Sequence, residues 1–322
     1  MYLGWMIISS FILIVSITKL LIYLRTGWCN SKICLIGKTV LVTGANTGIG
    51  YETALEFAKR GARVILACRD LIRAEQAKNR IISLTKNDNV IVKELNLVSL
   101  KSVRDLAEDI KKTEDKLHIL VNNAGVGFLK HKYTDDGLQI LMQINYFGPF
   151  LLTILLLDLL KRSGSSRIIN VASYLAKIAD LTPENINKPN EGYTNYGNSK
   201  LGNILFTMKL AKLLKNSDVT VYSVHPGTIA TNIFNFYKGI GKLILNFLSS
   251  LFFKTPEQGA QTTLYTALEQ GIEKYSGGHF EECSLVSTYA KAKNPDFADK
   301  IWNKTIEILD IEKDVEDCLF SD

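Results

Sequence analysis

Short apolar, β-branched runs alternate with helix-like segments along most of this 322-residue chain. The runs lie at 39–43, 63–67, 89–97, 117–125, 166–173 and 219–227. Nearly continuous apolar strands separated by helices predict a parallel sheet covered on both faces, a doubly wound α/β fold. Because ligands of such sheets bind beyond the carboxyl ends of the strands, we expect the functional residues directly after those ends.

The sequence "TGANTGIG", residues 43–50, joins the first predicted strand to the first helix. Gly44, Gly48 and Gly50 leave the backbone open, so a pyrophosphate can approach the N–H groups and the positive end of the helix dipole. The next strand completes a β-α-β unit of about 30 residues. The spacing G-x-x-x-G-x-G differs from the common dinucleotide pattern, so a glycine turn without a ligand is the alternative.

Tyr196 and Lys200 lie four residues apart in a predicted helix at 193–214, and therefore share one face. An ammonium beside a phenol is expected to lower the phenol pKa from about 10, which would suit it to proton transfer. Ser173, at the end of the preceding strand, can donate a hydrogen bond to a substrate oxygen while a hydride moves to or from a nicotinamide. A chance surface pair is the alternative for Tyr196 and Lys200.

Six motifs occur in the order typical of one enzyme family. They are "TGANTGIG", "NNAG" at 122–125, Asn145 in "QINYFG", Ser173 in "NVAS", "YGNSK" at 196–200 and "HPGT" at 225–228. Over residues 37–230 the chain thus resembles the short-chain dehydrogenase/reductase family. The resemblance implies a Rossmann-type fold, a nicotinamide cofactor and oxidoreductase activity.

The resemblance also implies roles for individual residues. Tyr196 is the expected general acid/base, and Lys200 the residue that lowers its pKa and holds the nicotinamide ribose. Ser173 is expected to orient the substrate oxygen, and Asn145 to support a proton relay through water to Lys200. The implied cofactor contacts, Thr228 being the one to the carboxamide, are Gly44, Asn46, Thr47, Gly48, Ile49, Gly50, Arg69, Asn96, Asn123, Ala124, Gly125, Tyr196, Lys200, Pro226, Gly227 and Thr228.

Two features depart from the family pattern. Ser173 precedes Tyr196 by 23 residues, so an insertion around 180–192 is expected to reshape the edge of the pocket. Asn96 stands where the family often has Asp, and its amide can still accept and donate hydrogen bonds to an adenine.

The residues after the second strand bear on cofactor choice. An acidic residue about 20 positions beyond the glycine loop is typical of NAD sites. Here Arg69 stands 19 residues past Gly50, and a guanidinium suits a 2′-phosphate. Asp70 is expected to cap the following helix instead. NADP(H) is therefore favoured, with NAD(H) as the alternative.

Residues 2–24 form an apolar run with one charge, Lys19, near its end. The run is long enough to span a bilayer, so we expect a membrane anchor over 1–25. Lys and Arg follow the run and do not precede it, which places the domain on the cytosolic side. A cleaved signal peptide is the alternative, although no A-x-A-like cleavage site follows the run.

Further segments, among them "GARVILACRD", "SKLGNILFT", "YSVHPGT", "KTPEQGAQT" and "SGGHF", resemble the membrane-anchored retinol dehydrogenases that act as retinal reductases. This resemblance implies an endoplasmic-reticulum enzyme facing the cytosol that reduces retinal or similar apolar aldehydes, and it allows a homodimer. A hydroxysteroid or long-chain keto-lipid reductase is the alternative, followed by a membrane-tethered NADP-binding scaffold.

The remaining expectations concern organisation and excluded sites. We expect the dehydrogenase domain over 37–290 and a solvated, structural helical tail over 291–322. "LILNFLSSLFF" at 243–253 is expected to form either a lid that dips into the bilayer or a buried helix, and Phe234, Phe236 and Tyr237 either line the substrate channel or fill core. No spacing of the 5 cysteines and 4 histidines suggests a metal site, and no basic stripe suggests nucleic acid.

Overall fold

The structure, a computed structural model, describes residues 2–127, 129, 132–189, 194–229 and 251–320. Most of the segment 243–253, for which a lid or a buried helix was predicted, lies outside the described residues. Phe234, Phe236 and Tyr237 also lie outside them.

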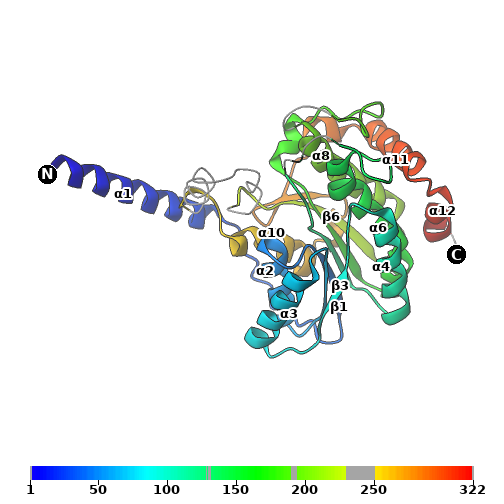
Figure 1. Cartoon of the computed structure of the whole chain (residues 1–322), viewed down its shortest axis with the longest axis horizontal. Helices are drawn as coiled ribbons and strands as arrows, with labels where there is room; N and C mark the ends of the chain where they lie inside the picture. The colour runs from blue at the N-terminus through cyan, green and yellow to red at the C-terminus, as the bar shows by residue number, and fades with distance from the viewer. Residues whose placement is uncertain (1, 128, 130–131, 190–193, 230–250, 321–322) are drawn as a thin grey trace.

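An eight-stranded sheet forms the centre of the described structure, in the order β3-β2-β1-β4-β5-β6-β7-β8 (Figure 1). The strands are β1 (Thr39–Thr43), β2 (Arg63–Cys68), β3 (Val90–Glu94), β4 (Ile119–Asn122), β5 (Ser166–Val171), β6 (Val219–His225), β7 (His279–Glu281) and β8 (Ser284–Val286). All neighbouring strands pair in parallel except β7 and β8. The predicted doubly wound α/β fold is confirmed, and the hairpin β7–β8 is an addition that the sequence patterns did not predict.

Helices cover both faces of the sheet (Figure 1). The α-helices that the structure describes are α1 (Tyr2–Arg25), which lies outside these layers, and α2 (Gly48–Lys59), α3 (Leu71–Thr85), α4 (Leu100–Thr113), α5 (Ile140–Met142), α6 (Gly148–Leu155), α7 (Leu157–Arg162), α8 (Thr194–Leu213), α10 (Pro256–Leu268), α11 (Pro295–Leu309) and α12 (Glu312–Phe320). Successive strand residues point to opposite faces, so Leu41 packs in the core under α4, α6 and α8 while Val40 and Val42 pack under α2, α3 and α10. Burial on both faces is the reason the strands read as continuous apolar runs.

Local signals placed two helix starts correctly and one wrongly. Asp70 caps α3 by accepting a backbone N–H group, as predicted. Ser99, which the sequence also marks as the capping residue of a helix, caps α4 in the same way. The apolar spacing of residues 134–161 predicts one long helix from about Thr134, but the helix begins only at Ile140. The residues before it form a turn in which the Thr134 N–H donates to the Leu138 carbonyl at 2.8 Å. This helix also contains a π-helical turn, Gln143–Phe147, that the sequence did not predict.

The C-terminal tail is less solvated than the sequence suggested. Trp302 of α11 is buried, with its ring 5.0 Å from that of Phe150 on α6 and 6.0 Å from that of Phe206 on α8. Thr305 of α11 hydrogen-bonds the Tyr146 hydroxyl in the π-helical turn at 2.9 Å. Helix α11 therefore completes the core on this side of the sheet.

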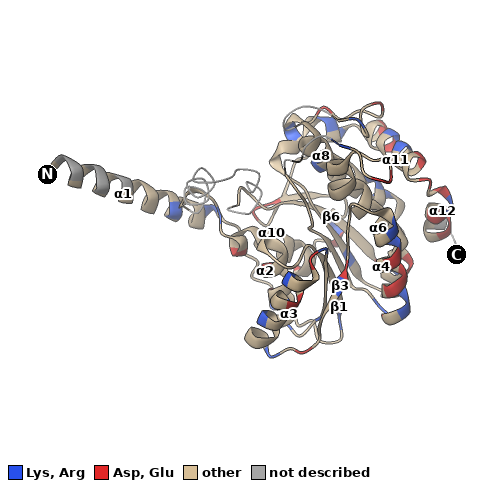
Figure 2. Ribbon diagram, in the orientation of Figure 1, with Lys and Arg blue, Asp and Glu red and all other residues tan. Residues whose placement is uncertain are grey.

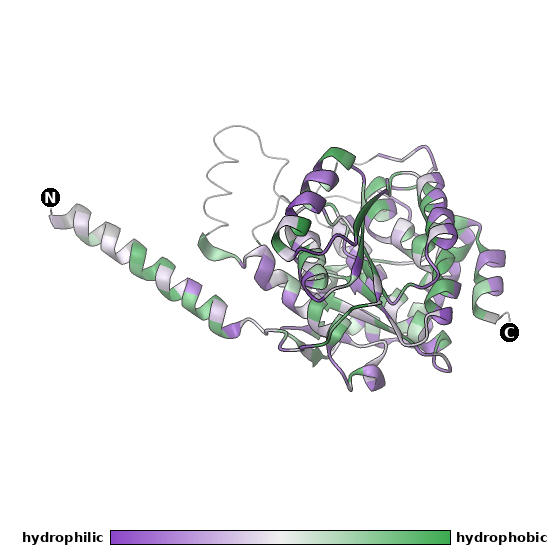
Figure 3. Cartoon of the chain, turned by 90° about the horizontal axis from the view of Figure 1, so that it is seen from below, coloured by the Kyte–Doolittle hydropathy of each residue, from purple (hydrophilic) through white to green (hydrophobic). Residues whose placement is uncertain are grey.

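Helix α1 extends away from the body of the molecule (Figures 1 and 3). Lys19 and Arg25 lie at its end nearest the body, where Figure 2 shows two blue segments. Large apolar side chains along the helix are exposed, including Trp5, Ile12 and Leu20. Among the residues that the structure describes, no helix meets the combined length and hydropathy needed to cross a membrane.

Candidate active site

The glycine loop between β1 and α2 has a backbone that only small residues permit. Gly44 and Gly48 have φ of 65° and 61°, and a Cβ on Gly50 would lie 2.4 Å from Asn123 Nδ2 and 2.5 Å from the Gly44 carbonyl oxygen. Thr47 precedes α2 without a side-chain cap, so the first N–H groups of the helix remain available to an acceptor. This cradle fits the pyrophosphate of a dinucleotide.

One threonine, at the start of the glycine loop, hydrogen-bonds the segment after β4. Thr43 Oγ1, fully buried, accepts the backbone N–H groups of Asn123 at 3.0 Å and Ala124 at 2.9 Å. The Asn123 side-chain amide donates in return to the Thr43 carbonyl at 2.9 Å. Asn123 therefore shapes the glycine loop, while its predicted place beside the adenosine stays a prediction. Thr43 was not among the predicted site residues. Its signal in the sequence is that it is a polar residue at the end of an apolar strand.

Gly125, Asn145 and Lys200 meet at one point beyond the sheet. A Cβ on Gly125 would lie 3.4 Å from both Asn145 Oδ1 and Lys200 Nζ. Asn145, in the π-helical turn, accepts the Val126 N–H at 2.8 Å and donates to the Val126 carbonyl at 2.9 Å and to Ser199 Oγ at 3.1 Å. The π-helical turn thus brings Asn145 to the ammonium that the sequence associated with it.

Tyr196 and Lys200 are buried side by side on α8, which resolves the choice between an internal pair and a surface pair. Lys200 Nζ lies 5.6 Å from the Tyr196 ring centroid and donates to the Val171 carbonyl at 2.9 Å. Ser173, two residues past the end of β5, hydrogen-bonds the Tyr196 phenol. The three predicted catalytic groups are therefore neighbours at the carboxyl end of β5.

The pKa of Tyr196 moves in the direction opposite to our expectation. Burial raises the phenol pKa, and the hydrogen bond from Ser173 offsets this only in part. Burial also lowers the pKa of Lys200 to about 8. Desolvation penalises both charged forms more than the neighbouring groups stabilise them. Tyr196 consequently keeps its proton at neutral pH, which is the form required of a proton donor.

Residues 38–238 match the family model of the short chain dehydrogenases. The chain belongs to this family. Retinol dehydrogenase 11 of Mus musculus is 42% identical to it over 97% of this chain and 99% of the relative. Both the predicted family and its retinol dehydrogenase branch are confirmed, and with them the expectation of an enzyme.

Solved structures of short-chain dehydrogenases and similar proteins agree with the fold. An uncharacterised protein of Mycobacterium paratuberculosis superposes with a TM-score of 0.70 at 28% identity, covering 88% of this chain and 98% of that protein. The Pseudomonas aeruginosa RhlG/NADP active-site complex gives a TM-score of 0.62 at 27% identity, covering 77% and 95%.

Two predicted adenosine-side residues of this short-chain dehydrogenase lie at the ends of β2 and β3. Arg69 directly follows β2 and is exposed, whereas Asp70 is engaged as the cap of α3. Asn96, two residues past β3, uses its Oδ1 to accept the Val98 N–H at 3.2 Å and its backbone N–H to donate to Ser102 Oγ at 3.0 Å. The Asn96 side chain thus shapes its own turn, and its contact with an adenine remains a prediction.

A glycine on α10 lies close to both the glycine loop and the segment after β6. A Cβ on Gly259 would lie 2.2 Å from Ile229 Cδ1, beyond β6, and 3.3 Å from Ile49 Cγ1 of the glycine loop. Gly259 therefore lets the segment that contains Pro226, Gly227 and Thr228 approach the glycine loop. The sequence did not predict a role for Gly259, because a lone glycine within a helix gives no functional signal.

Buried polar side chains fix the catalytic helix against the sheet. Asn122 of β4 donates to Thr153 Oγ1 at 2.9 Å and to Asn170 Oδ1 at 2.8 Å, and Asn170 donates to Thr207 Oγ1 on α8 at 2.9 Å. Each of these four residues is nearly inaccessible to solvent. Since unpaired polar groups are costly in the core, this chain of bonds favours a single register of α8.

Proposed function

We propose that this short-chain dehydrogenase is an NADP(H)-dependent oxidoreductase that interconverts retinol and retinal, or similar apolar alcohols and aldehydes, and acts mainly as a reductase. The observation that carries the proposal is the contact of Ser173, Tyr196 and Lys200 beyond β5, on the same edge of the sheet as the glycine loop. The retinoid substrate class is supported by the 42% identity to mouse retinol dehydrogenase 11.

Each catalytic residue has a distinct task in this proposal. When bound, the nicotinamide supplies or accepts a hydride at the substrate carbon. The Ser173 hydroxyl orients the carbonyl oxygen, and the Tyr196 phenol gives that oxygen its proton, so the aldehyde becomes an alcohol. The raised pKa of Tyr196 keeps the phenol protonated before the transfer. Lys200 and Asn145, which meet beside Gly125, favour reprotonation of the phenolate afterwards.

The cofactor preference follows from the residue after β2. A guanidinium can form charge-assisted hydrogen bonds with a 2′-phosphate, and Arg69 is exposed at the place where an acidic residue would bind a ribose 2′-OH. The related RhlG complex contains NADP, which supports the same choice.

Helix α1 is proposed to anchor the dehydrogenase to the endoplasmic reticulum membrane, with the domain in the cytosol. Its exposed apolar side chains would be costly in water and are stable among lipid chains. Lys19 and Arg25 lie at the end nearest the domain, where their charges can meet lipid headgroups.

A substrate panel tests the proposal directly. The full-length protein in liposomes is assayed with all-trans-retinal, a medium-chain aldehyde and a 17-ketosteroid, each with NADPH and with NADH, and kcat/KM values are compared. We expect the highest value for retinal with NADPH. A higher value for the ketosteroid would replace the substrate class, and no turnover of any carbonyl would overturn the proposed activity.

A further inference from the structure

The turn between β7 and β8 has an unusual backbone. Its two residues, Glu282 and Cys283, have φ of 50° and 57°, the left-handed region that two-residue hairpins normally fill with Asn and Gly. A side chain in this region costs free energy, and such residues cluster where the surrounding contacts serve a function. A glycine at position 282 would avoid this cost, but it would lack the Glu282 carboxylate and its contacts.

Each carboxylate oxygen of Glu282 contacts a different part of the chain. Glu282 Oε1 accepts a hydrogen bond from Lys254 Nζ, and Oε2 accepts the Gly27 N–H at 2.9 Å. The backbone is equally close, since a Cβ on Gly27 would lie 2.0 Å from the Glu282 carbonyl oxygen. One side chain thus connects the segment after α1 with the residue that precedes α10 by two positions.

Lys254 in turn contacts the loop after β6. Gly227 has a φ of 87°, and a Cβ there would lie 2.9 Å from Lys254 Cδ and 3.1 Å from Cε. The Lys254 N–H donates to the Thr228 carbonyl at 3.0 Å. Lys254 is 9% exposed, so its position depends on these contacts and on Glu282. The Gly227–Thr228 loop, which is expected to face the nicotinamide carboxamide, therefore packs against the Lys254 side chain.

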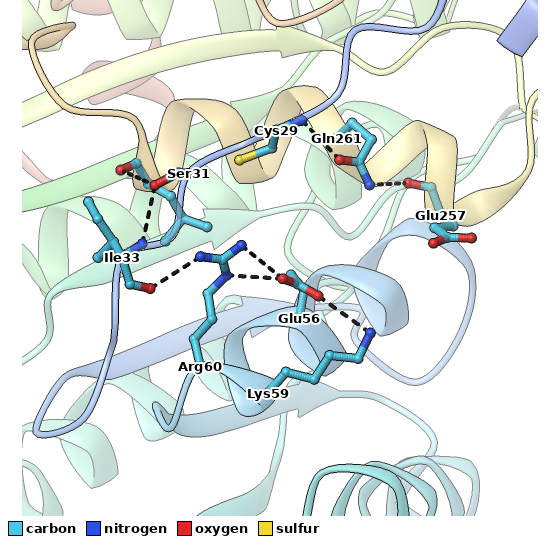
Figure 4. A network of polar contacts seen from close by, with 9 residues as sticks. Cys29, Ser31, Ile33, Glu56, Lys59, Arg60, Glu257 and Gln261 are labelled. Atoms are coloured by element: carbon cyan, nitrogen blue, oxygen red, sulfur yellow. Dashed lines mark hydrogen bonds and ion pairs between the residues drawn. The ribbon is translucent and has the colours of Figure 1, made fainter.

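The segment after α1 is itself bound to α10 and to the residue that follows α2. The Cys29 N–H donates to Gln261 on α10 at 3.1 Å, and the guanidinium of Arg60, which directly follows α2, donates to the Ile33 carbonyl at 3.2 Å. Figure 4 shows both contacts. At the end of α1, Lys19 Nζ donates to the Phe253 carbonyl at 3.2 Å. The chain is thus held on both sides of Gly27.

We infer that Glu282 is a positioning residue for the cofactor: it holds Lys254 against the Gly227–Thr228 loop and ties that loop to the segment that leaves α1. This inference rests on the proposed function, because it needs a nicotinamide beside the loop. It assigns to the strained turn a task that no motif of the sequence suggested.

A purely structural ion pair is the competing explanation, and the chain contains a matched control. Glu114, 7% exposed, forms a two-bond pair with Arg63 at the start of β2, the end of the sheet away from the cofactor loops. Glu114→Gln and Glu282→Gln each remove one carboxylate charge from a hydrogen-bonded pair. Only the second is expected to alter cofactor binding.

The test measures the Kd for NADPH by fluorescence titration of the full-length protein in detergent micelles, together with the melting temperature without cofactor. For Glu282→Gln and Lys254→Met we expect the Kd to rise about tenfold, the effect of losing one charge-assisted hydrogen bond. Lys254→Arg should largely restore the Kd. Gly27→Ala, which keeps both charges and displaces the turn, should raise the Kd as well.

The outcomes separate this inference from the proposed function. If wild-type protein binds NADPH and Glu282→Gln binds it equally well, the positioning role is wrong and the proposed function stands. The same holds if Glu114→Gln raises the Kd as much as Glu282→Gln does. If Glu282→Gln does not fold, an unchanged Kd in Gly27→Ala would still overturn the inference. If wild-type protein does not bind NADPH, the proposed NADP(H) dependence is wrong, and the positioning role, which depends on it, is wrong with it.

Discussion

The Lys200 ammonium donates a 2.9 Å hydrogen bond to the Val171 carbonyl oxygen, at the end of β5. Asn203 Nδ2 reaches the same oxygen at 3.2 Å, so Val171 keeps a partner if the lysine is removed. Burial lowers the Lys200 pKa from 10.5 to about 8, and the folded protein therefore holds this charge at a cost.

We predict that Lys200→Met stabilises the cofactor-free protein at pH 7, by at most about 3 kcal/mol, while it abolishes activity. Because the folded pKa is lower than the unfolded one, the unfolded state binds more protons between pH 8 and 10.5, and this lysine makes wild-type stability rise with pH over that range. The variant should lack the rise. Denaturant unfolding at several pH values measures both slopes, and equal slopes would contradict the buried charge.

Replacing Tyr196 by Phe should remove the proton donor and little else. We expect kcat for retinal reduction to fall about 10² to 10⁴-fold with an almost unchanged Kd for NADPH. Tyr222→Phe is the control, since Tyr222 is also buried and its hydroxyl donates to the Ile272 carbonyl at 3.1 Å outside the site. Normal turnover by Tyr196→Phe would remove the catalytic assignment.

Arg69→Asp should change cofactor preference. Losing one charge-assisted contact with the 2′-phosphate is expected to lower the ratio of kcat/KM for NADPH to that for NADH by about tenfold to a hundredfold. Lys101→Asp, an exposed charge reversal on α4, controls for net charge. A ratio that moves equally in both variants would show that long-range charge, not Arg69, sets the preference.

Gly50→Ala should prevent cofactor binding. The added Cβ would meet both Asn123 Nδ2 and the Gly44 carbonyl, so the glycine loop must open. Gly164→Ala is the control for a general loss of stability. Gly164 lies outside the glycine loop and has a φ of 76°, so alanine costs free energy there, but nothing would lie within 4 Å of its Cβ. Titration with NADPH compares the two variants, and tight binding by Gly50→Ala would contradict the proposed cradle.

Deleting residues 1–25 should release the protein from membranes. The deletion removes the exposed apolar side chains of α1 and leaves the sheet and its covering helices in place. Flotation with liposomes of endoplasmic reticulum composition compares the full chain with the truncated one. A truncated protein that still floats with the lipid would show that the domain itself binds the membrane.

The strands and the glycine loop could be predicted from the sequence because their signals are local. Runs such as 39–43 and 63–67 are apolar on both faces, and Gly44, Gly48 and Gly50 mark a loop that excludes side chains. Tyr196 and Lys200 share a face by helical spacing alone. In each case the residues that carry the signal are close in sequence.

The rest depends on contacts between distant segments. Glu282 and Cys283 form a hairpin turn without Asn or Gly, so no turn signal marks them, and their partners include Gly27. The raised pKa of Tyr196 reflects burial by the whole fold, which spacing within α8 cannot reveal. The π-helical turn that holds Asn145 likewise has no compositional signature.

The hydrogen bond between Tyr146 and Thr305 has a consequence for folding during translation. Tyr146 neighbours Asn145 and its ring lies against Gly202 on α8, so the segment around the site is completed by a residue of α11, far along the chain. At ordinary translation rates the ribosome needs on the order of tens of seconds to make the chain between α1 and α11. A nascent chain whose first helix has already emerged is therefore still without α11, and the dehydrogenase is expected to become active only after α11 has emerged and packed as well.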